Sequence, residues 1–137
     1  MKTSARNEFN GQITEIISGE VMSEIKVNIN ADFKISAIIT NEGKEAMELD
    51  KGKDITALIK SSVIVLSKEK IKATARNIIE GKVIEIIKGQ VNSEVQLAVQ
   101  NNTIYSVITN DAVDDLGLKV GDTAYAIFKA STVILVS

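Results

Sequence analysis

The chain has 137 residues and a formal net charge of −2; 45% of its residues are hydrophobic and 25% are charged. These proportions are ordinary for a soluble globular protein, and no apolar run reaches the roughly 20 residues that a membrane-spanning helix needs. Cysteine and histidine are absent, which excludes disulfides, thiolate nucleophiles, zinc sites built from these residues and a histidine general base.

The first part of the chain predicts three strands, a short helix and two further strands. Alternation of apolar and polar residues is the main signal for the strands. The predicted strands are 10–18, 21–30, 33–40, 55–60 and 62–67. A turn is expected at 31–32, and a break at Ser61 separates the last two strands. Because asparagine is a favoured N-cap, Asn41 is expected to cap the helix, which ends near 51–52.

The second part of the chain repeats the first. Segment 74–89 matches segment 4–19 with these residues unchanged: Ala5, Arg6, Asn7, Gly11, Glu15, Ile16, Ile17 and Gly19. The matching later elements are strands over 91–99, 104–109, 124–129 and 132–136, a polar turn at 100–102, and a helix from Asn110 to 116–117. An internal repeat of this kind indicates two copies of one small unit.

The repeat predicts the domain organisation and the fold class. We expect a first domain over 1–68, a linker over 69–73 and a second domain over 74–137. Three strands, a short helix and two strands are the element order of an OB-like barrel. The expected fold is therefore all-β, with two OB-like five-stranded barrels in tandem. So small a unit gains little from its own core, so each copy is expected to pack against its twin or against other chains.

Four groups of polar residues recur in both copies. They are 4–7 with 74–77, 23–24 with 93–94, 39–41 with 108–110, and 60–62 with 129–131. The first, third and fourth groups supply hydrogen-bond donors, and the third lies where a helix begins, with free N–H groups and a positive dipole end. Donors that converge favour an anion carrying no proton, because a protonated oxyanion would need an acceptor.

Structural interpretations of the same residues stay open. Asn41 and Asn110 are good helix caps, and Thr40 and Thr109 are ordinary residues for a strand end. The arginines and lysines fit solvated surface pairs, and Ser23 with Glu24 fits a polar pair beside a turn. The repeated glycines fit bends or bulges in barrel strands.

The ordered motifs resemble those of a known family. In each copy Ser/Thr-Ala-Arg-Asn is followed by Gly, by Gly-x-Val-x-Ser-Glu, by Ile-Thr-Asn and by Lys-Ala/Ser-Ser, and the second copy also has Leu-x-Leu-x-x-Gly. This set resembles the Mop domain, the small molybdate- and tungstate-binding unit of the wider TOBE class. The whole chain is similar to a tandem di-Mop protein. The resemblance implies OB-like barrels that bind a tetrahedral oxyanion between domains, in chains that assemble as homotrimers.

The resemblance also implies the residues of the sites. For the first copy they are Ser4, Ala5 and Arg6, meeting Thr40, Lys60 and Ser61 of another domain; for the second copy they are Thr74, Ala75, Arg76, Thr109, Lys129 and Ala130. A second kind of site near the symmetry axis is implied at Gly19, Val21, Ser23, Glu24, Gly89, Val91, Asn92, Ser93 and Glu94. Two departures affect these sites. Met22 stands where the second copy has Asn92, and Gly43 and Ala112 stand where the family often has a serine.

The functional hypothesis is intracellular binding and storage of molybdate, or of tungstate, without catalysis, cofactor or bare metal cation. Because no apolar segment follows Lys2 and Arg6, no secretory signal is expected and the protein is expected to be cytoplasmic. One alternative is an OB-type nucleic-acid module, although only 4% of residues are aromatic and the pI is about 5.2. Another is a regulatory oxyanion-sensing module of a transport or transcription system. No nucleic-acid or membrane partner is expected.

Overall fold

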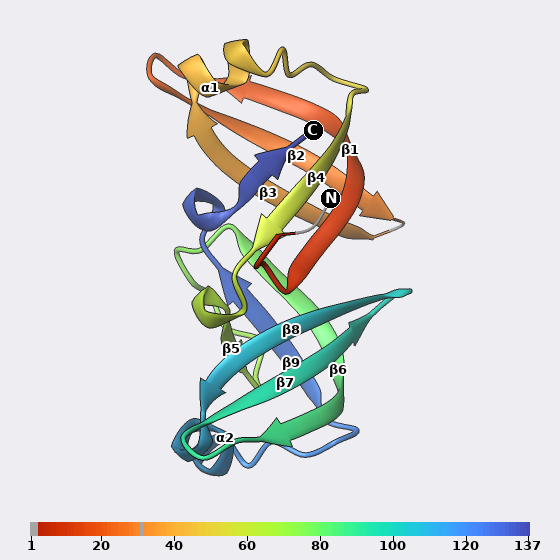
Figure 1. Cartoon of the computed structure of the whole chain (residues 1–137), viewed down its shortest axis with the longest axis vertical. Coiled ribbons are helices and arrows are strands. Elements are labelled where there is room, and N and C mark those ends of the chain that lie inside the picture. Colours follow the sequence, from red (N-terminus) through yellow and green to blue (C-terminus); the bar gives the residue numbers. More distant parts are fainter. Residues whose placement is uncertain (1–2, 31) are drawn as a thin grey trace.

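Two five-stranded sheets lie one above the other along the longest axis of the molecule (Figure 1). The computed structural model describes residues 3–30 and 32–137, so the predicted turn at 31–32 lies partly outside the described residues. The two α-helices lie at opposite ends of the molecule (Figure 1). Neither helix in the described part of the chain has the length and hydrophobicity needed to cross a membrane.

The elements follow the same order in each copy. In the first copy they are β1 (Asn7–Ser18), β2 (Met22–Asn30), β3 (Phe33–Thr40), α1 (Asn41–Ala46), β4 (Asp54–Ile59), η1 (Ser61–Val63) and β5 (Val65–Ser67). In the second they are β6 (Asn77–Lys88), β7 (Asn92–Val99), β8 (Asn102–Thr109), α2 (Asn110–Leu116), β9 (Thr123–Phe128), η2 (Ala130–Thr132) and β10 (Ile134–Val136). The predicted all-β class and the order of strands and helix are confirmed.

The last strand of each copy is shorter than predicted. The sequence predicts strands over 62–67 and 132–136, but each region starts with a 3₁₀ turn and only three residues remain extended. The turns are closed by hydrogen bonds from the Val63 amide to the Lys60 carbonyl (3.2 Å) and from the Thr132 amide to the Lys129 carbonyl (3.1 Å). These turns redirect the chain away from the strand that precedes them.

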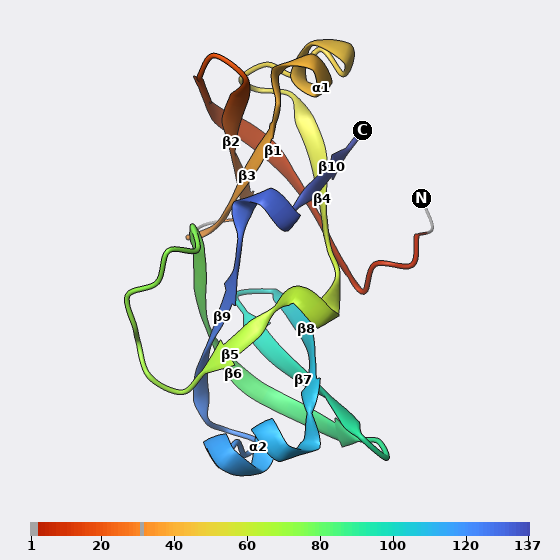
Figure 2. The same cartoon turned by 90° about the vertical axis from the view of Figure 1, so that its left-hand side faces the viewer.

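The two short strands are exchanged between the copies. Their positions are seen from the side in Figure 2, where β10 lies beside β4 and β5 lies with the second sheet. The sheet orders are β10-β4-β1-β2-β3 and β5-β9-β6-β7-β8. Leu135 of β10 pairs with Ala57, and Leu66 of β5 pairs with Ala126. Each five-stranded sheet therefore contains residues of both copies.

One hydrophobic core extends through both sheets. The alternation predicted for β2 is realised, because Ile25 and Val27 are fully buried. Phe9 meets Phe33 edge to face, with ring centroids 5.2 Å apart, a favoured arrangement for aromatic pairs. The exchanged strands contribute Leu66 and Leu135, which are both buried in this core. The exchange thus brings apolar surface of each copy into the interior of the other sheet.

The helix starts differ from the prediction by one residue. Thr40, not Asn41, is the N-cap of α1, and its Oγ1 accepts a hydrogen bond from the Gly43 amide (3.1 Å). In α2 the Oγ1 of Thr109 accepts from the Ala112 amide in the same way (3.1 Å). The prediction that Asn41 and Asn110 cap these helices was therefore wrong. α1 also ends at Ala46, earlier than the predicted 51–52.

Gly11 marks a close approach between strands and not a bulge. A Cβ atom there would lie 2.5 Å from the carbonyl oxygen of Asn28. The register of β1 against β2 shifts three residues later, between Ile13 and Glu15. The second copy repeats both features, with Gly81 close to Ala98. Glycine is therefore needed here because the adjacent strand leaves no room for a side chain.

Candidate functional site

Asn7 and Asn77 join the two copies through buried side chains. Asn7 Nδ2 donates to the carbonyl oxygens of Ile59 (3.1 Å) and Tyr105 (2.8 Å), and the Tyr105 amide donates to Asn7 Oδ1 (2.8 Å). Asn77 makes the equivalent pair with Ser36: the Ser36 amide donates to Oδ1 (2.8 Å), and Nδ2 donates to the Ser36 carbonyl (2.9 Å). Each asparagine thus satisfies main-chain groups of an edge strand in the other copy.

The neighbouring arginines form ion pairs between the copies. Arg6 Nε donates to Glu94 Oε1 at 3.0 Å, and Arg76 Nη1 lies 3.4 Å from Glu24 Oε1. The hydrogen bond with the Glu94 carboxylate is the main cause that raises the pKa of Arg6. The resemblance implies that these arginines and glutamates belong to different kinds of anion site. The structure brings them together as reciprocal pairs.

The Arg6 pair has an aromatic partner that the Arg76 pair lacks. The guanidinium carbon of Arg6 lies 4.1 Å from the ring centroid of Tyr105, within the range of a cation–π contact. Ser36 occupies the equivalent place beside Arg76, where it helps to line a cleft of about 420 Å³. Sequence reasoning missed Tyr105, although the change from serine to tyrosine between the copies was a visible signal.

Three of the predicted oxyanion ligands surround one pocket. Ser4, Ala5 and Lys60 line a pocket of about 300 Å³ together with Thr3, Leu58 and Ile134. The Ala5 amide donates to the hydroxyl of Thr3 (3.2 Å). Lys60 here belongs to the same copy as Ser4, whereas the resemblance implies a lysine from another domain. The second copy contributes Ile134, from the exchanged strand β10.

Thr40 lies in a second pocket of about 350 Å³ whose lining is mostly apolar. Met22 and Met47 are among the lining residues, and Ser131 of η2 is a further hydroxyl. Ile134 lines both this pocket and the pocket of Lys60, so the two pockets flank β10. Within one chain, Thr40 and Lys60 are therefore in adjacent pockets and not around one ligand.

The 3₁₀ turns also cross between the copies. η2, which follows Lys129, packs on β3, and η1, which follows Lys60 and begins with Ser61, packs on β8. The hydroxyl of Ser106 in β8 donates to the Ile64 carbonyl after η1 (2.8 Å). Each turn is therefore positioned against the strand that leads to the helix-capping threonine of the other copy.

The second copy offers different surroundings for the equivalent residues. Thr109 lines a polar pocket of about 440 Å³ with Lys88, Asp111 and Asp114. Ala130 is buried and has no hydroxyl, whereas the equivalent Ser61 is half-buried. The other predicted ligands, Thr74, Ala75, Arg76 and Lys129, lie at the equivalent positions, and all but the half-buried Ala75 are exposed. The two copies are therefore not equivalent in chemistry.

The segments predicted as a second kind of site form a junction between a hairpin and a helix. The hydroxyl of Ser23 is hydrogen-bonded to Asn41 Oδ1, and Asn41 Nδ2 donates to the Gly19 carbonyl (2.9 Å). In the second copy Ser93, Asn110 and Gly89 make the same connection, with 3.0 Å for the amide bond. Asn41 and Asn110 therefore support the hairpin instead of capping the helix.

The hairpin tips themselves expose apolar side chains. Val21 is 70% exposed and Val91 is 69% exposed. A Cβ atom on Gly19 would lie 2.9 Å from the Met22 carbonyl, and one on Gly89 would lie 2.7 Å from the Asn92 carbonyl. The glycines thus allow tight tips that present valine to the surroundings.

The family of the chain follows from comparison with known domains. Residues 3–66 and 73–135 match the family described as the TOBE domain. The chain belongs to the TOBE family. Two tandem TOBE copies confirm the resemblance inferred from the motifs. The matched ranges cover all the repeated polar groups described above and both sheets except for the last residue of β5 and of β10.

Relatives of this TOBE chain are named for molybdenum. The molybdenum transport protein ModE of Azotobacter vinelandii is 44% identical over 137 residues, which cover 98% of this chain and 51% of the relative. The molybdenum-pterin-binding protein MopA of Rhodobacter capsulatus is 36% identical over 138 residues, covering 98% of this chain and 52% of the relative. The chain thus spans about half the length of these curated relatives.

A solved structure is similar over its whole length. It is that of the cytoplasmic molybdate-binding protein ModG with molybdate bound. The two chains superpose with a TM-score of 0.94 at 39% sequence identity, and the match covers 98% of each chain. The tandem TOBE architecture with two curled sheets is therefore shared with a protein that binds an oxyanion.

Proposed function

We propose that this TOBE chain binds molybdate, or tungstate, and acts in the cytoplasm as a store or buffer of the oxyanion, not as an enzyme. The observation that carries the proposal is the pocket lined by Ser4, Ala5 and Lys60. Further support comes from ModG, a cytoplasmic protein of the same architecture that has been solved with molybdate bound.

The pocket has the chemistry for an anion without a proton. Of the described residues that line it, Thr3 and Ser4 have hydroxyl groups and Lys60 has an ammonium group, and none of them is acidic. A tetrahedral dianion such as molybdate accepts hydrogen bonds on every oxygen. Hydrogen bonds to charged groups contribute about 1.5–3 kcal/mol each. Several such bonds offset the repulsion from a chain whose net charge is −2.

We propose that the site is completed by another chain in a homotrimer. Thr40 and Ser61 are outside the pocket of Lys60 in a single chain, so a neighbour would have to supply such groups. The exposed Val21 and Val91 at the hairpin tips are surface that assembly would cover. In this arrangement the segments 19–24 and 89–94 would lie against neighbouring chains, as the resemblance implies for the second kind of site.

Calorimetry with molybdate, tungstate and sulfate tests the proposal. The parent chain is expected to show saturable binding of molybdate or tungstate at micromolar concentrations. Lys60→Ala is expected to weaken binding, whereas Lys51→Ala, which removes the same charge from an exposed turn, is expected to bind as the parent does. Sedimentation analysis of the same samples is expected to give a trimer. Absence of saturable binding of either metal oxyanion contradicts the proposed function.

A further inference from the structure

The two copies hold their equivalent segments with unequal contacts. The segment 4–6 leads into β1, and the segment 74–76 leads into β6. Arg6 is hydrogen-bonded to Glu94 at 3.0 Å and stacked on Tyr105 at 4.1 Å. Arg76 lies 3.4 Å from Glu24. Ser36, the first-copy equivalent of Tyr105, lines the same cleft as Arg76 and provides no aromatic ring. The first segment is therefore held by one more side-chain contact than the second.

The additional contact between Arg6 and Tyr105 lies next to the pocket of Lys60. Ser4 and Ala5 immediately precede Arg6, and among the described residues the Ala5 amide is hydrogen-bonded only locally, to the Thr3 hydroxyl. The position of Ser4 and Ala5 relative to Lys60 thus depends on the anchors that follow them, Arg6 and Asn7. Asn7 is bound to the carbonyl of Ile59, the residue before Lys60. Because Arg6 and Asn7 are both held in place, Ser4 and Ala5 on one side of the pocket and Lys60 on the other are held in fixed positions.

We propose that Tyr105 is a positioning residue for the first-copy pocket: its stack on Arg6 preorganises Ser4 and Ala5 opposite Lys60. The second-copy site, built on Thr74, Ala75 and Lys129, lacks this contact and binds the same oxyanion more weakly. The inference rests on the proposed function, because it concerns the affinity of that same class of site. Tyr105 touches Arg6 and does not line the pocket.

The experiment separates the two sites by removing one lysine at a time. In a Lys129→Ala background, Tyr105→Ser is expected to raise the dissociation constant for molybdate by about two- to fivefold, the range for an exposed cation–π contact. In a Lys60→Ala background the same change is expected to have no effect. Tyr105→Phe keeps the ring and is expected to retain the affinity of the Lys129→Ala chain. Calorimetry with molybdate measures all of these chains.

A reciprocal change gives an independent readout. Ser36→Tyr places a ring beside Arg76, and in the Lys60→Ala background it is expected to tighten molybdate binding by about two- to fivefold. The hydrogen bonds between Asn7 and Tyr105 are made with main-chain atoms of Tyr105, so Tyr105→Ser keeps both partners. Thermal melting checks the fold of each variant.

The possible failures are distinguishable. The inference is overturned if Tyr105→Ser changes nothing in the Lys129→Ala background, if it weakens both backgrounds equally, or if Tyr105→Phe weakens binding as much as Tyr105→Ser. If the parent chain itself shows no saturable molybdate binding, the proposed function fails first. If both lysine variants bind as the parent does, the assignment of the pockets fails, and the role of Tyr105 fails with it.

Discussion

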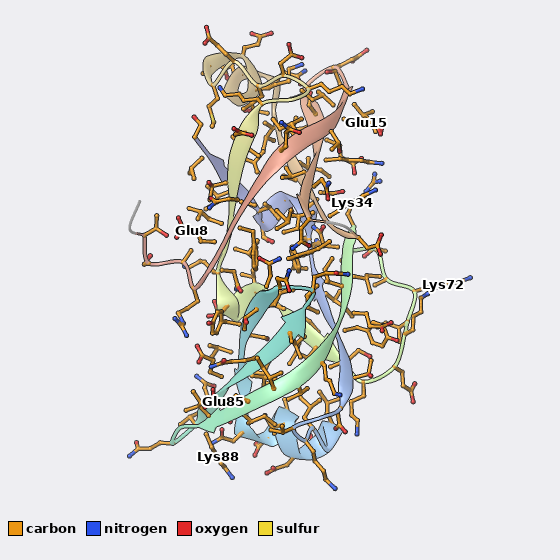
Figure 3. The ribbon with its side chains drawn as sticks, turned by 90° about the vertical axis from the view of Figure 1, so that its right-hand side faces the viewer. Glu8, Glu15, Lys34, Lys72, Glu85 and Lys88 are labelled. Carbon is orange, nitrogen blue, oxygen red and sulfur yellow. The ribbon has the colours of Figure 1, made fainter. Side chains whose placement is uncertain are left out.

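Ile134 of β10 pairs with Leu58 of β4, although the two residues belong to different copies of the repeat. The linker between the copies is exposed at Lys70, Ile71 and Lys72, and Lys72 points away from both sheets (Figure 3). We expect a chain cut within 69–73 to remain one species in size-exclusion chromatography, because the exchanged strands still hold the fragments together. The fragments should separate only in denaturant. Separation under native conditions would show that the exchange contributes little to holding the copies together.

Asn7 is expected to matter more for stability than Asn77. Asn7→Ala removes three hydrogen bonds and leaves the half-buried main-chain N–H and C=O of Tyr105 without these partners, whereas Asn77→Ala removes two. Leaving buried polar groups unpaired costs about 1–3 kcal/mol. Urea unfolding is expected to show a loss in that range for Asn7→Ala and a smaller loss for Asn77→Ala. Equal stability of Asn7→Ala and the parent would show that the hydrogen bonds of Asn7 to Ile59 and Tyr105 contribute nothing to stability.

The backbone conformation of Glu48 is expected to lower the free energy of unfolding of the chain. Its φ is 52°, in the left-handed region, and Gly117 takes the same place after α2 with a φ of 62°. A non-glycine residue pays a steric penalty of about 1–2 kcal/mol there, partly offset by the entropy that glycine loses on folding. We expect Glu48→Gly to raise the free energy of unfolding by up to about 1 kcal/mol.

The matched change in the second copy serves as the control for this prediction. Gly117→Glu is expected to lower the free energy of unfolding by a similar amount, since a Cβ atom at Gly117 meets nothing within 4 Å and only the backbone conformation is unfavourable. Denaturation of both variants in urea gives the two values. Changes of the same sign in the two variants would mean that backbone strain is not the cause.

Asp122 is expected to give a pH-dependent contribution to stability. The hydrogen bond donated by the Lys119 amide (2.9 Å) is the main cause that lowers the pKa of its carboxyl group, and Lys68 at 3.4 Å acts in the same direction. Since the folded-state pKa lies below the unfolded value of about 3.9, this stabilisation is present above that value and is lost as the pH falls through the folded-state pKa.

Asp122→Asn measures this contribution. At pH 7 the variant is expected to unfold at a lower urea concentration than the parent, and the difference should shrink once the pH is lowered below about 4. A difference that stays constant from neutral to acid pH would show that the Asp122 charge is not its source.

The strands could be predicted from the sequence because their burial alternates along the chain. Ile25 and Val27 face the core and their neighbours do not. The exchange of β5 and β10 could not be predicted in the same way. β4 and β9 present similar apolar residues, such as Ala57 and Ala126, so the pattern is the same whether the last strand returns to its own copy or crosses to the other.

The candidate site could be predicted in part. Ser4, Ala5 and Lys60 line one pocket within a single copy, whereas the resemblance implies that the lysine comes from another domain. The pairing of Arg6 with Glu94 joins two motifs that are far apart in the chain, and spacing within one copy carries no signal for a contact between copies. Thr40 and Asn41 are both good caps; Asn41 is engaged by Ser23 and Gly19 instead, which only the folded hairpin reveals.

The crossing of β5 and β10 separates the unit that is duplicated in the sequence from the unit that folds. A protein with one copy alone would have a sheet without its final strand. Such a protein would have to complete the sheet with a strand from a second polypeptide. Fusion of two copies converts such pairing between molecules into an internal exchange whose success no longer depends on protein concentration.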